Sequence, residues 1–114
     1  MNGDPSPGET APTDAVFAAL ASPVRRDLLR LLLDGPRTAG DLASHFAMRR
    51  PSVSEHLRVL REAGLVSERR SGRERHYRLE SGPLLDLREW LHPYEIFWRR
   101  RLKALGDVLD EEER

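Results

Sequence analysis

Arg49-Arg-Pro-Ser-Val-Ser-Glu-His-Leu-Arg-Val-Leu-Arg-Glu-Ala-Gly-Leu-Val66, followed by Ser67-Glu-Arg-Arg-Ser-Gly-Arg-Glu-Arg-His-Tyr-Arg-Leu79, is the stretch that decides the fold. Its first part predicts an amphipathic helix, because proline suits the first helical turn and Val53, Leu57 and Leu60 recur at helical spacing. Its second part predicts a basic two-stranded hairpin around a Ser-Gly turn. An exposed helix beside a basic hairpin is suited to a DNA groove and the neighbouring backbone.

Further helices are expected on both sides of this stretch. Thr13 and Ser22 are N-cap residues for the first and second helices, and Thr38 caps a third that is joined to the 49–66 helix by a short connection. After the hairpin, a fifth helix starts near Pro83, and Pro93 is expected to interrupt or restart it. The predicted fold is therefore mainly α with a small β-hairpin, in the order ααααββαα of a winged helix-turn-helix.

Length and composition bound the class of protein. The 114 residues suit one domain, expected over 13–109, with a proline-rich disordered tail at 1–12 and an acidic tail at 110–114. The chain has no cysteine, which excludes disulfides and thiolate metal sites. No apolar run is long enough to span a membrane, and no signal-peptide pattern is present, so a cytoplasmic location is expected.

Charge is unevenly distributed along a chain whose net charge is zero. Residues 49–79 contain nine arginines against four glutamates, whereas both ends of the chain are acidic. This asymmetry favours a polyanion as partner, although a solvated surface hairpin has the same composition.

The predicted DNA-facing side chains lie on the 49–66 helix and on the hairpin. Arginines at the helix start and in the hairpin suit phosphates, while serine and histidine also reach base edges. Some have alternative roles: Ser52 as a cap, Glu55 as a partner of Arg58, and Arg58 as a partner of Glu62. The full set comprises Arg49, Arg50, Ser52, Ser54, Glu55, His56, Arg58, Arg69, Arg70, Arg73 and Arg75.

Three segments closely resemble the ArsR/SmtB family of bacterial transcriptional regulators. They are Leu20-Ala-Ser-Pro-Val-Arg-Arg-Asp-Leu-Leu-Arg-Leu-Leu32, Asp41-Leu-Ala, and Ser54-Glu-His-Leu-Arg-Val-Leu-Arg-Glu-Ala-Gly-Leu-Val66. The resemblance spans roughly residues 13–109. It implies a homodimer that binds a pseudo-palindromic double-stranded operator, more often as a repressor, and that pairs through its first and last helices. The apolar and aromatic residues expected at that interface are Val16, Phe17, Leu20, Trp90, Tyr94, Phe97, Trp98, Leu102 and Leu105.

A regulatory metal is an alternative within the same fold. Asp86, Glu89, His92 and Glu95 recur every three residues, and their nitrogen and oxygen donors suit nickel or zinc. The sequence departs from the patterns of the metal-sensing family members, however. No cysteine pair lies at 38–42, and Arg88 stands where an Asp-x-His pair would have its histidine.

Two other classes of function compete with DNA binding. A protein-interaction module or co-regulator would work through the aromatic C-terminal helix, with its acidic end. An enzyme is not expected, because the chain lacks a glycine-rich phosphate loop and a cysteine nucleophile. Ser54 and His56 do not face each other on a helix, so they do not form a catalytic pair.

Overall fold

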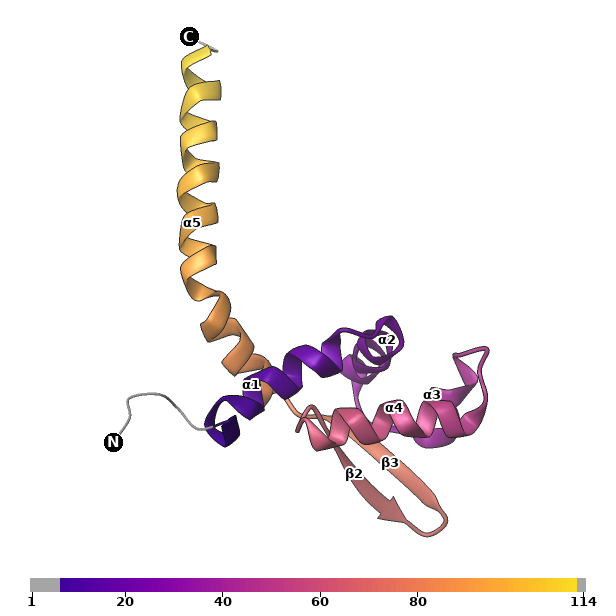
Figure 1. Ribbon diagram of the computed structural model, residues 1–114. Coiled ribbons are helices and arrows are strands. Elements are labelled where there is room, and N and C mark those ends of the chain that lie inside the picture. Colours follow the sequence, from indigo (N-terminus) through magenta and orange to yellow (C-terminus); the bar gives the residue numbers. More distant parts are fainter. Residues whose placement is uncertain (1–6, 113–114) are drawn as a thin grey trace, which may run out of the picture.

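Four helices precede a β-hairpin, and one long helix follows it (Figure 1). The computed structural model describes residues 7–112. In chain order the elements are α1 (Pro7–Leu20), α2 (Pro23–Leu31), the 3₁₀ turn η1 (Leu32–Asp34), β1 (Arg37–Thr38), α3 (Ala39–Ser44), α4 (Arg50–Glu62), β2 (Val66–Ser71), β3 (Glu74–Leu79) and α5 (Gly82–Glu112). No helix among these is long and apolar enough to cross a membrane.

Two of the predicted helix starts are confirmed by their N-cap residues, Ser22 for α2 and Thr38 for α3. The Ser22 hydroxyl accepts a hydrogen bond from the Arg25 amide at 3.4 Å, and Pro23 occupies the first helical turn. The Thr38 hydroxyl accepts from the Asp41 amide at 3.1 Å. Each cap satisfies one of the amides that a helix N-terminus leaves without an intrahelical partner.

The sheet has three antiparallel strands in the order β1-β3-β2. The hairpin strands pair in register from Val66–Leu79 to Ser71–Glu74, and Gly72 makes the turn with a φ of 62°. Most side chains are strained at that φ, so glycine is favoured there. The two-residue strand β1, which the sequence did not reveal, pairs with Tyr77 and His76 of β3 and ties the start of α3 to the hairpin.

A single apolar core lies where the first four helices meet the base of the hairpin. Val53, Leu57 and Leu60 of α4 are buried, as their spacing predicts. They pack in one cluster with Leu28 of α2 and Leu42 of α3, among others. At about 1.5–3 kcal/mol for each large apolar side chain, this burial fixes α4 against the other helices.

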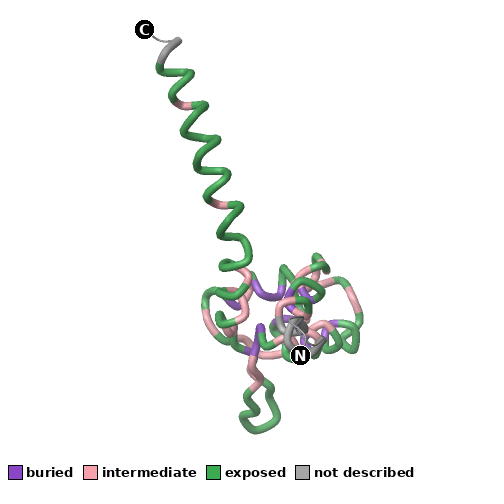
Figure 2. Tube along the Cα trace, turned by 60° about the vertical axis from the view of Figure 1, so that its left-hand side comes forward, coloured by how far each residue is buried: buried purple, intermediate pink, exposed green. Residues whose placement is uncertain are grey.

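The last helix is continuous, and this corrects the expected interruption at Pro93, which lies inside α5. Proline removes one backbone bond and crowds the preceding turn, so it bends a helix without always ending it. Figure 1 shows α5 bending near its base and then running straight. Most of its length is exposed (Figure 2), so water can satisfy the carbonyl that the proline leaves free.

The element boundaries also differ at the two ends of the chain. Helix α1 begins at Pro7, whereas the sequence placed the first helix from Thr13 onwards after a tail. Helix α5 continues to Glu112, through most of the expected acidic tail. Residues 1–6 and 113–114 lie outside the described range.

Candidate nucleic-acid interface

Helix α4 presents a polar face on the side opposite its buried stripe. Ser52, Ser54, Glu55 and Arg58 are exposed, as predicted for residues off the stripe. Arg49 is the N-cap residue, and the arginine after it begins the helix, so two cations precede the exposed face. These side chains offer donors for both phosphates and base edges.

A cleft of about 320 Å³ separates α4 from the hairpin. Three arginines, Arg50, Arg73 and Arg75, converge on it together with Ser54. The other lining residues are Thr38, Ala39, Gly40, Glu74 and Tyr77. The fold thus brings part of the predicted set together from two separate segments, and the cleft is lined by three cations against one carboxylate.

The end of the Arg50 side chain lies close to Gly40. A Cβ at Gly40 would stand 3.1 Å from Arg50 Nη2, which is tighter than nine in ten real Cβ contacts, so the arginine side chain would have to shift slightly. Within the described part of the chain, neither Arg50 nor Arg73 has an ion-pair partner. Their charges are available to an anion.

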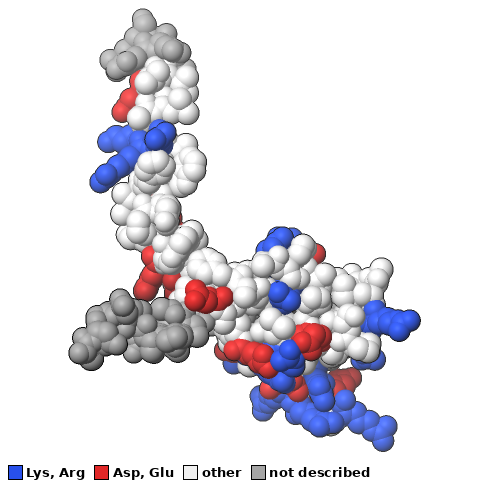
Figure 3. Space-filling model, in the orientation of Figure 1, with Lys and Arg blue, Asp and Glu red and all other residues white. Residues whose placement is uncertain are grey.

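The hairpin extends this positive surface beyond the cleft (Figure 3). Arg70 lies directly opposite Arg75 across the strands, and Arg69 lies opposite His76. Like charges at opposed positions destabilise a strand pair, so a bound anion would relieve this repulsion. Arg69, Arg70, Arg73 and Arg75 are all exposed, as DNA contact would require.

Arg58 is bound to two carboxylates of its own helix. It donates hydrogen bonds to Glu55, with Nε–Oε2 at 3.0 Å, and also to Glu62. The Arg58 guanidinium holds the pKa of the Glu55 carboxyl below its ordinary value, and both carboxylates raise the pKa of Arg58. The predicted Glu55–Arg58 pair is therefore present, and so is the alternative pairing with Glu62.

Glu68 connects α4 to the hairpin at the edge of the cleft. Its carboxylate, in a side chain only 18% exposed, pairs with Arg61 of α4 and lies 3.6 Å from Arg75 Nε. The Tyr77 hydroxyl donates to it at 3.3 Å. Burial raises the pKa of Tyr77, and the Glu68 carboxylate adds to this effect.

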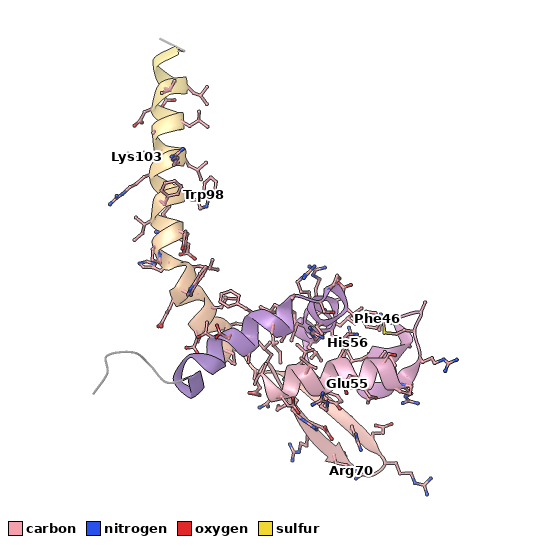
Figure 4. The ribbon with its side chains drawn as sticks, in the orientation of Figure 1. Phe46, Glu55, His56, Arg70, Trp98 and Lys103 are labelled. Atoms are coloured by element: carbon pink, nitrogen blue, oxygen red, sulfur yellow. The ribbon has the colours of Figure 1, made fainter. Side chains whose placement is uncertain are left out.

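His56 lies apart from the other predicted DNA-facing residues. It is half-buried, and its Nδ1 is 3.2 Å from Arg25 Nη1 of α2. Figure 4 shows His56 on the side of α4 that faces α2, whereas Arg70 projects from the hairpin. His56 is three residues after Val53, so helical spacing places it at the border of the buried stripe.

Aromatic residues join α1 to the base of α5. Phe17 packs edge-on against Trp90 at 5.2 Å between ring centroids, and Trp90 stacks on Tyr94 at the same distance. Farther along α5, the predicted interface residues Phe97, Trp98, Leu102 and Leu105 are exposed, Leu102 by 64%. Val16 instead is buried in the core at 2% exposure, and Leu20 packs against that core.

The proposed metal ligands do not converge. Among the described residues, no group of three or more histidine, aspartate or glutamate side chains is placed to hold a metal ion. His92 Nδ1 lies 3.9 Å from Glu95 Oε2, but Asp86 and Glu89 do not join this pair in such a group. A nickel or zinc centre needs more ligands than this pair supplies, so the described residues of a single chain do not complete one.

The sequence did not reveal three residues of this region. Arg25 and Glu68 make their contacts across elements, and only the fold brings their partners near. Gly40 allows the close approach of Arg50. Gly40 was the one of the three with a signal in the sequence, because a glycine inside a predicted helix disfavours the helix and often indicates close packing at that position.

A helix-turn-helix whose second helix is exposed, next to a basic hairpin, defines a winged-helix DNA-binding protein. The model of the "Bacterial regulatory protein, arsR family" matches residues 22–68. The transcriptional repressor SdpR of Bacillus subtilis is 42% identical over 76 residues, which are 67% of this chain and 84% of that protein. The HTH-type transcriptional regulator Rv2034 of Mycobacterium tuberculosis is 38% identical over 99 residues, 87% of this chain and 90% of that protein.

Solved structures agree with these sequence relatives. The crystal structure of an ArsR family transcriptional regulator matches with a TM-score of 0.71 at 33% identity, over 77% of this chain and 91% of that one. The chain therefore belongs to the ArsR family of bacterial regulatory proteins. It is a DNA-binding transcriptional regulator and not an enzyme.

Proposed function

We propose that the protein is a repressor that binds a pseudo-palindromic double-stranded operator as a homodimer. The observation that carries the proposal is the cleft between α4 and the hairpin, where Arg50, Arg73 and Arg75 converge. SdpR, which is 42% identical to this chain over 76 residues, is named a transcriptional repressor, which supports the direction of regulation. A regulator of this kind acts where the chromosome is, in the cytoplasm.

In this proposal α4 enters the major groove and the hairpin follows the backbone. Ser52 and Ser54 face base edges or phosphates from the exposed side of α4, with Arg49 at its start. Arg50, Arg73 and Arg75 hold a phosphate at the cleft, and Arg69 and Arg70 extend the contact along the hairpin. Arg58, bound to two carboxylates, contributes less net charge.

The homodimer is proposed to form through α5, with Phe17 and Trp90 at its base. Trp98 is 61% exposed and Leu102 64%, and eleven large apolar side chains of α5 are exposed in the single chain. Apolar surface of this extent on one helix favours a protein partner. A second copy supplies the same stripe, and twofold symmetry matches a palindromic site.

A co-regulator protein is the other occupant that the α5 surface would accept. It becomes the better explanation if the purified protein is a monomer in which the stripe stays exposed. A nickel- or zinc-responsive form of the same regulator is the alternative, and it would have to complete the His92–Glu95 pair with ligands from a second copy.

The test is a DNA titration across a salt series. A duplex is selected from a random library by the purified protein, and its affinity is compared with that of a scrambled duplex by fluorescence anisotropy. We expect a clear preference for the selected duplex and a steep loss of affinity with salt, because bound arginines release counterions from phosphates. Equal affinity for both duplexes, or affinity that does not change with salt, contradicts the proposal.

A further inference from the structure

Arg25 joins three helices through one guanidinium group. From α2, its Nε donates to the Ala19 carbonyl at 2.6 Å and its Nη2 donates to the Ala18 carbonyl at 3.0 Å. Its Nη1 lies 3.2 Å from His56 Nδ1 on α4. The two carbonyls belong to the last turn of α1, where the helix dipole favours a cation, and the Ala18 carbonyl also accepts from the Ala21 amide at 3.3 Å.

The contact with His56 fixes the chemistry of the imidazole. A guanidinium group has five N–H donors and no acceptor, so Nδ1 must be the acceptor and carry no proton. In the neutral ring the proton is then on Nε2. A protonated imidazole would present a donor to a donor, and the contact would be lost.

We propose that Arg25 is a positioning residue for operator binding. It holds His56 in the Nε2–H form and so sets the recognition helix α4 against the C-terminal turn of α1. Phe17 in that turn packs on Trp90, so the same contacts connect α4 to the base of α5. The functional part of this inference rests on the proposed operator binding.

Arg26 provides a matched control on the same helix. Its Nη1 donates to the Leu20 carbonyl at 2.8 Å, so it also binds the end of α1. Its side chain is exposed, and this hydrogen bond does not involve α4. Arg25→Gln loses two bonds to α1 and the bond to α4, whereas Arg26→Gln loses one bond to α1 and leaves α4 untouched.

The first measurement uses the free protein with ¹⁵N-labelled histidine at a pH where the imidazole is neutral. We expect the His56 nitrogens to report an unprotonated Nδ1 and a protonated Nε2 in the wild type and in Arg26→Gln. In Arg25→Gln we expect a mixture of the two tautomers. A His56 spectrum that is unchanged in Arg25→Gln overturns the inference.

The second measurement is operator affinity. Losing a bond that involves a charged group is expected to weaken binding about tenfold in Arg25→Gln, relative to Arg26→Gln, with the dimer intact. Equal affinities of the two variants overturn the inference. If the wild type binds no selected duplex, the proposed function fails, and the NMR result still decides whether Arg25 holds His56.

Two variants at position 56 test the same point without removing the bonds of Arg25 to α1. In His56→Asn the amide oxygen can take the place of Nδ1 as acceptor, whereas in His56→Gln the amide reaches the place of Nε2. We expect the asparagine variant to keep operator affinity within about twofold and the glutamine variant to lose about tenfold. The reverse order shows that His56 contacts DNA itself, and it overturns the inference.

Discussion

The α4–hairpin face and the α5 helix expose different kinds of side chain in the single chain. The first gathers arginine side chains around a polar cleft. The second exposes aromatic and aliphatic side chains over most of 31 residues. Figure 3 shows the contrast, with blue side chains crowded on the hairpin and much of the visible face of α5 white, apart from a basic band and some acidic side chains.

This contrast assigns a different kind of partner to each surface. Arginines without ion-pair partners are satisfied by phosphates, at a strength that depends on salt. Exposed apolar stripes are satisfied by another apolar surface, at a strength that does not fall with salt in this way. Substitutions on α5 should therefore change dimerisation, whereas substitutions on the α4–hairpin face should change operator affinity and leave the dimer intact.

The largest effect is expected from Leu102→Glu on α5. A carboxylate in the middle of the apolar stripe should prevent dimer formation, and operator affinity should fall about a hundredfold, because two linked half-sites bind far more tightly than one. Light scattering and the anisotropy titration measure the two effects. Lys103→Gln, at the adjacent exposed position, should change neither, and a dimer that persists in Leu102→Glu would contradict the assignment of the stripe.

The next effect is expected from Arg73→Ala in the turn of the hairpin. Loss of one phosphate contact should weaken binding to all duplexes about tenfold and reduce the salt slope by about 1, with the dimer unchanged. Arg78→Ala is the control, because Arg78 lies on β3 outside the cleft and is 3.3 Å from a carboxylate oxygen of Glu80. A change in dimerisation, or an equal loss of affinity in both variants, would contradict the assignment of the cleft as a DNA-binding site.

A smaller effect is expected at the base of the hairpin from Tyr77→Phe. Losing the hydrogen bond to Glu68 should lower the free energy of unfolding by about 1 kcal/mol at neutral pH. Burial raises the pKa of Tyr77, so the folded state favours the protonated phenol. The stabilisation is therefore present below the ordinary tyrosine value of about 10 and lost as the pH rises past it. Urea titrations of both proteins between neutral and alkaline pH should converge, and a constant difference would contradict this.

The smallest effect is expected from Glu55→Gln on α4. Removing this carboxylate reduces repulsion of phosphates and frees part of the Arg58 charge, so operator affinity should rise about threefold. Glu62→Gln is the control, because it frees the same arginine from its other carboxylate. Glu62 lies about two helical turns from Glu55 along α4. If both variants tighten binding equally, the effect comes from Arg58 alone and not from the position of Glu55.

Periodicity and capping predicted most of the fold correctly. Ser22 and Thr38 begin their helices, and Val53, Leu57 and Leu60 are buried, because both features depend on neighbours within a few residues. The Glu55–Arg58 pair was predictable for the same reason. Strand β1 was not, since two residues form a strand only by pairing with a distant partner.

The remaining differences have physical causes. Pro93 does not end α5, because an exposed helix can leave a carbonyl to water and accommodate the ring by bending. His56 was expected to face outward, yet its spacing from Val53 puts it on the border of the core, beside an arginine from another helix. The convergence of Arg50, Arg73 and Arg75 depends on how the hairpin folds back towards α4, which no local pattern specifies.

Hydroxyl-radical footprinting on the selected duplex tests most directly whether the protein binds DNA through the α4–hairpin face while it is a dimer through α5. The account predicts two symmetric protected patches whose centres are about one helical turn, roughly 34–36 Å, apart. A single unsymmetric patch under saturating wild-type protein would show one chain on the DNA without a dimer, and would contradict the account.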